Sequence, residues 1–120
     1  TMTRVLVVDD EYAIVEALEA LLTDEGYTVV AAKDGVEGLE KLREQKPDFC
    51  LLDLMMPVMS GDQLLEKLAH DSTIPRCPII LMSAARRDDL VGNGGAAAFL
   101  RKPFGIQELL DTIARVLQKP

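Results

Sequence analysis

Three widely spaced runs of apolar residues most constrain how this chain can fold. Residues 5–8 (VLVV), 49–52 (FCLL) and 79–82 (IILM) are apolar at every position. Strands that are apolar on both faces are typical of the centre of a parallel sheet, because helices cover both sides of such a sheet. Weaker runs at residues 28–32 and 97–100 predict two further strands, the first of them at a sheet edge.

The intervals between these runs carry apolar residues at helical spacing, which predicts that helices alternate with the strands. Gly26 is placed to end the first helix in a left-handed conformation. The pattern predicts an α/β domain with a doubly wound five-stranded parallel sheet and helices on both faces. The supporting positions are Ile14, Leu18, Leu21 and Leu22; Val36, Leu39 and Leu42; Leu64, Leu65 and Leu68; and Ile106, Leu109, Leu110, Ile113 and Leu117.

The regular alternation weakens between residues 84 and 95. Gly92, Gly94 and Gly95 follow a short polar stretch at residues 86–89. Each glycine inside a helix costs about 1 kcal/mol relative to alanine. We therefore expect a shortened fourth helix region that is frayed or partly loop.

Composition limits the size, partners and location of the protein. The chain has 120 residues, 48% of them hydrophobic, which is enough for one core, so we expect a single domain over residues 1–120. A formal net charge of -7 argues against binding to nucleic acid or to an anionic membrane. Cys50 and Cys77 lack the spacing of a zinc or redox site, and the sequence has neither a membrane-spanning stretch nor a secretion signal. We expect a cytoplasmic protein with two free thiols.

Charged residues follow several of the predicted strands. Asp9 and Asp10 close the first apolar run, Asp53 closes the run at residues 49–52, and Lys102 follows the last strand. The carboxyl ends of parallel strands share one rim, where ligands bind. Three carboxylates there repel one another unless a cation lies among them. Mg²⁺, with Mn²⁺ as an alternative, fits Asp10 and Asp53 as ligands, with Asp9 holding a metal-bound water.

The same rim has the groups that phosphoryl transfer needs. A metal neutralises charge on an incoming phosphoryl group, and Lys102 is placed to bind another of its oxygens. Ser83, at the end of the run at residues 79–82, adds a hydroxyl donor. A carboxylate is then able to act as the nucleophile and form an acyl phosphate.

Four motifs in order carry a resemblance to a known family. They are VLVVDDE at residues 5–11, LDLMMP at residues 52–57 followed by Gly61, Ser83-Ala84, and residues 95–104 with FLRKPF at their end. Over essentially its whole length the chain resembles the response-regulator receiver domains of two-component signalling. The resemblance implies a flavodoxin-like strand order of 2-1-3-4-5.

The resemblance also implies a role for each residue of the rim. Asp53 accepts a phosphoryl group from a sensor histidine kinase or a histidine phosphotransfer protein. Asp10, Asp53 and the backbone carbonyl of Met55 ligate Mg²⁺, and Ser83 and Lys102 bind the phosphoryl group. The domain is then a signalling module, not an enzyme in the usual sense, because it catalyses only its own phosphorylation and dephosphorylation.

A switch and an output follow from the same resemblance. Phe99 is the switch aromatic, which turns inward when Ser83 moves toward the phosphate, and Lys102-Pro103 is a cis peptide. A downstream effector protein or domain reads the change. Met55 and Ala85 stand two residues beyond the acceptor and the hydroxyl, and neither side chain orients an attacking water. We therefore expect slow self-dephosphorylation.

Simpler interpretations of single residues remain open at this point. The run from Asp9 to Glu11 is also what a helix N-terminus favours, and Ser83 alone suits a helix cap. Asp53 alone suits a turn after a strand. Phe99 alone suits plain packing in the core.

Three other functions compete with the receiver. A haloacid dehalogenase-type phosphohydrolase needs two acids in the pattern Asp-x-Asp, whereas Asp53-Leu54-Met55 has one. A flavodoxin-like nucleotide binder needs a glycine-rich phosphate loop after the first strand, where this chain has acids. A phosphorylation-independent receiver-like interaction module is the remaining alternative, and Mg²⁺-dependent phosphorylation discriminates it from a working receiver.

Overall fold

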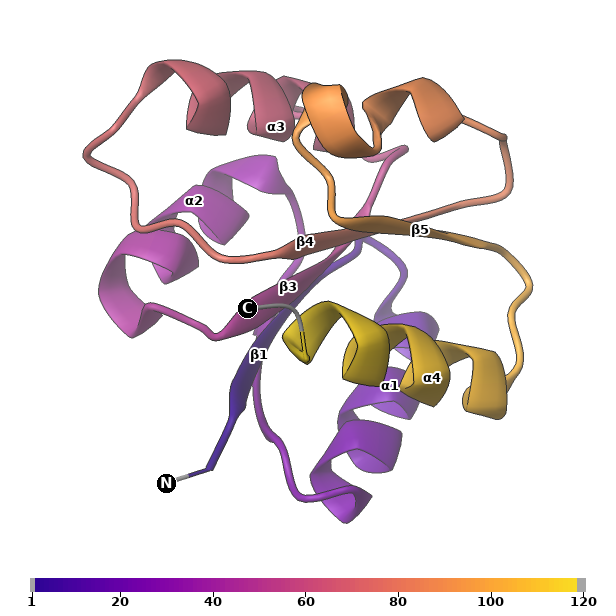
Figure 1. Cartoon of the computed structure of the whole chain (residues 1–120). Helices are drawn as coiled ribbons and strands as arrows, with labels where there is room; N and C mark the ends of the chain where they lie inside the picture. Colours follow the sequence, from indigo (N-terminus) through magenta and orange to yellow (C-terminus); the bar gives the residue numbers. More distant parts are fainter. Residues whose placement is uncertain (1, 119–120) are drawn as a thin grey trace.

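The computed structural model describes residues 2–118, so Thr1, Lys119 and Pro120 of the expected domain lie outside the described residues. Its five strands form one parallel sheet in the order β2-β1-β3-β4-β5, which confirms the predicted fold class and strand order. Figure 1 labels β1, β3, β4 and β5 of this sheet. The elements are β1 (Arg4–Val8), α1 (Tyr12–Asp24), β2 (Thr28–Ala32), α2 (Gly35–Gln45), β3 (Phe49–Asp53), α3 (Gly61–His70), β4 (Ile79–Ser83), the 3₁₀ turns η1 (Asp88–Leu90) and η2 (Gly92–Gly94), β5 (Ala98–Arg101) and α4 (Ile106–Leu117).

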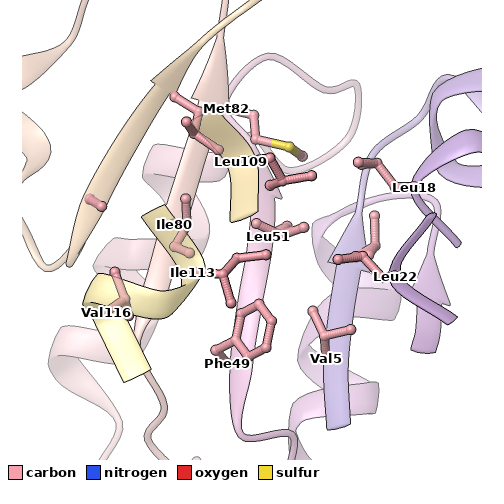
Figure 2. Packing of buried hydrophobic residues seen from close by; sticks show 13 residues of the cluster. Val5, Leu18, Leu22, Phe49, Leu51, Ile80, Met82, Leu109, Ile113 and Val116 are labelled. Atoms are coloured by element: carbon pink, nitrogen blue, oxygen red, sulfur yellow. The ribbon is translucent and has the colours of Figure 1, made fainter. Parts of the chain in front are cut away.

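The helices cover both faces of the sheet and enclose two apolar clusters. Helices α1 and α4 lie on one face, and α2 and α3 lie on the other (Figure 1). Figure 2 shows the first cluster, in which Leu18 and Leu22 of α1 extend toward the strands. Phe49 in this cluster meets Tyr27 edge to face, with ring centroids 5.6 Å apart. Alternate residues of each central strand thus contribute to opposite clusters.

The apolar runs became strands where the sequence predicted them. All five residues of β3 and all five of β4 are buried, as the centre of a two-sided sheet requires. Strand β2 forms an edge, as expected, and Gly26 has a φ of +98° just after α1. Three residues of the predicted apolar stripes are exposed instead of buried, because they lie in the first or last turn of their helices. They are Val36, Ile106 and Leu117.

The helix expected between β4 and β5 is reduced to η1 and η2, which confirms the shortened region. Backbone hydrogen bonds close this segment on itself, from Gly92 N to Ala96 O at 2.8 Å and from Ala96 N to Leu90 O at 2.9 Å. A Cβ on Gly94 would lie 2.8 Å from the Asp89 carbonyl oxygen. Glycine is therefore required here for a tight turn, where the sequence suggested only a weakened helix.

Candidate functional site

Three carboxylates meet at the carboxyl ends of β1 and β3. Asp9 and Asp10 follow β1, and Asp53 is the last residue of β3. One oxygen of each carboxylate lies within 4.8 Å of one oxygen of each of the others. Asp9 and Asp53 are buried and Asp10 is exposed, so the cluster opens to solvent on one side. The predicted convergence of these strand ends is confirmed.

Lys102 reaches this cluster from the end of β5. Its Nζ lies 3.0 Å from Asp9 Oδ2, 3.4 Å from Asp53 Oδ1 and 4.0 Å from Glu11 Oε1. The Lys102 backbone N–H donates to the Ser83 carbonyl at 2.9 Å, and the Lys102-Pro103 peptide is cis, as expected. The side chain of Lys102 is only 17% exposed, so solvent screens these ion pairs weakly.

Burial and charge perturb the acid–base behaviour of the site. Burial, followed by the charge of Asp9, raises the pKa of Asp53 to about 6 despite the opposing effect of Lys102. Burial opposes ionisation of Lys102, but hydrogen bonding and charge from Asp9, reinforced by Asp53, raise the pKa of the ammonium. The ionised form of Asp53 is therefore disfavoured in this site, and a further cation beside the carboxylate would stabilise it.

The acidic run orders the loop before α1 instead of capping the helix. The Asp9 Oδ1 atom accepts a hydrogen bond from the Glu11 backbone N–H at 2.9 Å. Glu11 is the N-cap of α1 and makes no side-chain capping hydrogen bond. Asp9 is thereby fixed in place by both Lys102 and the following backbone.

Ser83 ends β4, one residue after the register partner of Asp53, and is 2% exposed. Its Oγ accepts a hydrogen bond from the Ala85 backbone N–H at 3.1 Å, and the next element in the chain is the 3₁₀ turn η1, so it does not cap an α-helix. The Arg101 Nε donates to the Ala84 carbonyl at 3.3 Å, a contact that the sequence did not predict. Ser83 and Arg101 are register partners across β4 and β5, which explains why Arg101 reaches the loop after Ser83.

The loop after Asp53 has two features that bear on the site. Gly61 N donates to the Leu54 carbonyl at 2.8 Å and folds the loop back onto the end of β3. Val58 has a φ of +69°, which is rare for a β-branched residue, and its side chain is 81% exposed. The sequence did not predict the left-handed conformation of Val58, because no residue pattern around this position indicates it. The Met55 side chain points out to solvent and is 68% exposed.

Phe99 lies on β5, two strands from Asp53 on β3. Its partly buried side chain packs against the cluster on the α2 and α3 face of the sheet. Phe99 and Arg101 lie on the same face of β5 because side chains alternate along a strand. Ser83 is opposite Arg101 in register, so Phe99 lies one diagonal step from the hydroxyl.

The residues at the rim fit a hard divalent cation. Carboxylate and carbonyl oxygens are the ligands that Mg²⁺ and Mn²⁺ prefer, and two carboxylates with waters satisfy the coordination of Mg²⁺. Burial, with the charge of Asp9 as the second cause, raises the pKa of Asp53 despite Lys102, so the ionised carboxylate is disfavoured without a further cation. A divalent ion bound at this cluster would supply that positive charge.

The sequence profile of the response regulator receiver domain matches residues 5–114. The chain belongs to this family. Among its curated relatives, the response regulator MprA of Mycobacterium ulcerans is 39% identical over 119 residues, covering 97% of this chain and 50% of that protein. Hybrid signal transduction histidine kinase D of Dictyostelium discoideum is 37% identical over 94% of this chain and 7% of its own length. The chain thus spans half or less of these relatives.

Solved receiver structures have the same fold. The chemotaxis response regulator CheY4 of Vibrio cholerae is 35% identical, with a TM-score of 0.87 over 98% of this chain and 100% of that one. The receiver domain of sensor histidine kinase PA1611 from Pseudomonas aeruginosa is 25% identical, with a TM-score of 0.85 over 99% and 100% of the two chains. That structure has a magnesium ion coordinated in the active-site cleft.

The structure bears on two expectations from composition, one about membrane-spanning segments and one about the two thiols. Within residues 2–118, each helix is too short or too polar to cross a membrane. Cys50 and Cys77 are free thiols, and burial raises the pKa of both, that of Cys77 to about 11. Both cysteines therefore stay protonated at neutral pH, which makes them poor nucleophiles.

Proposed function

We propose that this receiver domain is a phosphoacceptor, in which Asp53 takes a phosphoryl group from a phosphohistidine of a sensor histidine kinase or histidine phosphotransfer protein. A carboxylate oxygen of Asp53 bonds to phosphorus as the P–N bond to the donor imidazole breaks, and the electron pair stays on the imidazole nitrogen. The observation that carries the proposal is the ammonium of Lys102, which contacts both Asp9 and Asp53 at 3.0 and 3.4 Å.

The reaction would require a divalent cation, Mg²⁺ or its substitute Mn²⁺, which Asp10, Asp53 and the backbone carbonyl of Met55 would hold. Asp9 would hold a water of that ion. When bound, the cation neutralises negative charge on the phosphoryl group and on the attacking carboxylate. The magnesium ion in the Pseudomonas aeruginosa receiver domain supports this assignment, as does the mutual approach of three carboxylates.

Lys102 and Ser83 bind the phosphoryl oxygens in this proposal. The Lys102 ammonium already lies 3.4 Å from the acceptor carboxylate, so little movement is needed for it to contact a group attached there. The Ser83 oxygen accepts from Ala85 N and so keeps its O–H available as a donor. Both contacts strengthen as negative charge builds up on the phosphoryl oxygens during transfer. They therefore stabilise the transferred group.

Phosphorylation is then read as a change on the β4–β5 side of the domain. Ser83 moves toward the phosphoryl group, and Phe99 turns further inward into the space that this movement opens. Pro103, beside Lys102, holds the turn from which that lysine reaches the site. The receiving partner is a downstream effector protein or domain, and the domain catalyses only its own phosphorylation and dephosphorylation. The cytoplasmic location and the extent of the domain over residues 1–120 stay predictions.

Intact-mass measurement after incubation with a small acyl-phosphate donor tests the proposal. The protein is incubated with and without Mg²⁺, beside Asp53→Asn and the matched control Asp24→Asn, which removes an exposed carboxylate at the end of α1. We expect one phosphoryl addition that requires Mg²⁺, is absent in Asp53→Asn and persists in Asp24→Asn. Equal addition to Asp53→Asn would refute the assignment of the acceptor. No addition to any variant, without Mg²⁺ binding, would favour a phosphorylation-independent interaction module.

A further inference from the structure

A groove runs between α1 and the end of β2, and one end of it reaches Asp9 and Asp10 of the acidic cluster. It encloses about 440 Å³ of space. The half-buried side chains of Val15 and Ala31 and the buried Ala32 form an apolar floor. We call it the α1–β2 groove and define it by Tyr12, Val15, Glu16, Glu19, Ala31 and Ala32.

The sequence of α1 explains why this groove has an apolar floor and a polar rim. Leu18 and Leu22 occupy the stripe that packs on the sheet, as Figure 2 shows. Tyr12, Glu16 and Glu19 recur at positions i, i+4 and i+7, which places them on one neighbouring stripe. Helix α1 packs beside β2, the edge strand, so this second stripe borders the groove instead of the core.

The rim has one exposed aromatic ring and an excess of negative charge. The Tyr12 side chain is 78% exposed, although a tyrosine ring presents a large apolar surface. Glu16 and Glu19 are exposed, and within residues 2–118 neither carboxylate has a cation in ion-pair contact. The other charged residues of the lining are Lys33 and Glu37, which offset each other, and Asp9 and Asp10, which add negative charge. The uncompensated charge of the rim is therefore negative.

We infer that the α1–β2 groove docks a basic amphipathic helix of a partner protein. Apolar side chains of that helix lie on Val15 and Ala31, the Tyr12 ring packs against it, and its lysines or arginines pair with Glu16 and Glu19. The two glutamates are three residues apart, which matches the spacing of cations along one face of a helix. Tyrosine is enriched among the residues that dominate binding energy at interfaces, and complementary charge favours specificity and rapid association.

A titration with synthetic peptides tests the docking surface without any phosphodonor, so its outcome is independent of Asp53 chemistry. The probe is a helical leucine–lysine peptide with all leucines on one face, beside its leucine–glutamate counterpart and a glycine–lysine peptide of equal charge. Amide chemical shifts of the protein are followed in excess Mg²⁺. We expect the leucine–lysine peptide alone to bind and its shift changes to centre on Tyr12, Glu16 and Ala31.

Charge reversal decides between the groove and general attraction to an acidic protein. We expect the double variant Glu16→Lys/Glu19→Lys to weaken binding at least about tenfold. The matched control Glu40→Lys/Glu44→Lys makes the same charge change on the exposed face of α2 and should change affinity less than about twofold. Tyr12→Ala should weaken binding and Tyr12→Phe should retain it, with circular dichroism verifying the fold of each variant.

The inference is overturned by any of three results. Equal weakening by the two double variants would mean that only net charge attracts the peptide. Binding of the glycine–lysine peptide with the same affinity would exclude a role for the apolar floor. Shift changes centred on Ile14, Ala84 and Phe104 would place the peptide in a different groove, on the other side of α1.

Discussion

Gly61 lies so close to Asp53 that a Cβ at residue 61 would stand 2.7 Å from the Asp53 carbonyl oxygen. The start of α3 is therefore pressed against the backbone of the proposed acceptor, and Gly61 N also binds the Leu54 carbonyl at 2.8 Å. No side chain fits in this contact without displacement of the end of β3. The placement of the Asp53 carboxylate depends on the absence of a side chain eight residues later in the chain.

Substitution of Gly61 by serine should destabilise the domain by about 1–3 kcal/mol, the usual cost of overpacking against a rigid backbone. The control is Gly105→Ser, because residue 105 is the N-cap of α4 and has open space for a Cβ. Urea denaturation should show a lowered midpoint for Gly61→Ser alone. Equal midpoints for the two variants would contradict the packing described for Gly61.

Substitution of Asp53 by asparagine should stabilise the metal-free domain at neutral pH. Because burial raises the pKa of Asp53 from 3.8 to about 6, the folded state binds a proton between these pH values that the unfolded state has released. Wild-type stability therefore falls as pH rises from about 4 to about 6. Above that range Asp53→Asn should be more stable by on the order of 1–2 kcal/mol, after allowance for solvent screening.

Denaturation in EDTA at pH 4 and pH 7 measures this difference, with Asp24→Asn as the exposed-site control. The advantage of Asp53→Asn should be present at pH 7 and should shrink toward pH 4. A stability difference that stays constant over this range would mean that the ionisation of Asp53 is not the cause.

Replacement of Lys102 by methionine should destabilise the metal-free domain by about 2–3 kcal/mol at pH 7, because two buried carboxylates lose their cation. The pKa of Asp53 should rise further, since Lys102 lowers it in the wild type. Addition of Mg²⁺ should restore part of the lost stability by supplying positive charge. A control with Lys67→Met, on the exposed surface of α3, should show neither effect.

Replacement of Val58 by glycine should stabilise the domain by about 1 kcal/mol, since a left-handed conformation is unfavourable for residues with a Cβ. Val36→Gly should instead destabilise the domain, because residue 36 lies in the first turn of α2 and glycine disfavours a helical backbone. Thermal unfolding of the two variants compares the shifts directly. A lowered melting temperature for Val58→Gly would contradict the strain assigned to this loop.

Replacement of Met55 by asparagine should shorten the lifetime of the phosphorylated domain several-fold, because an amide beside Asp53 is able to orient an attacking water. The control is Met55→Leu, which cannot hydrogen-bond and should leave the lifetime unchanged. Decay of the phosphorylated mass with time measures both. An unchanged lifetime in Met55→Asn would show that water placement at this position does not limit hydrolysis.

The sequence predicted which side chains meet where the strands end. It did not predict the features that depend on close contact between backbone segments. Asp9, Asp53 and Lys102 share a rim because their strands are parallel, which the apolar runs predicted, and they converge because of the strand order, which the family resemblance implied. The left-handed Val58 depends on how the loop after β3 closes onto α3, which has no pattern in the sequence. The approach of Gly61 to Asp53 and the raised pKa of Asp53 likewise require coordinates.

Identification of the phosphorylated residue is the most direct test of the central claim. After reaction with the acyl-phosphate donor in Mg²⁺, borohydride reduces an aspartyl phosphate to homoserine, and peptide mass spectrometry then locates the homoserine. The account predicts homoserine at residue 53 alone, in amounts that fall when Mg²⁺ is omitted. Homoserine at residue 9 or 10, or phosphate that resists reduction and remains on a serine or histidine, would contradict it.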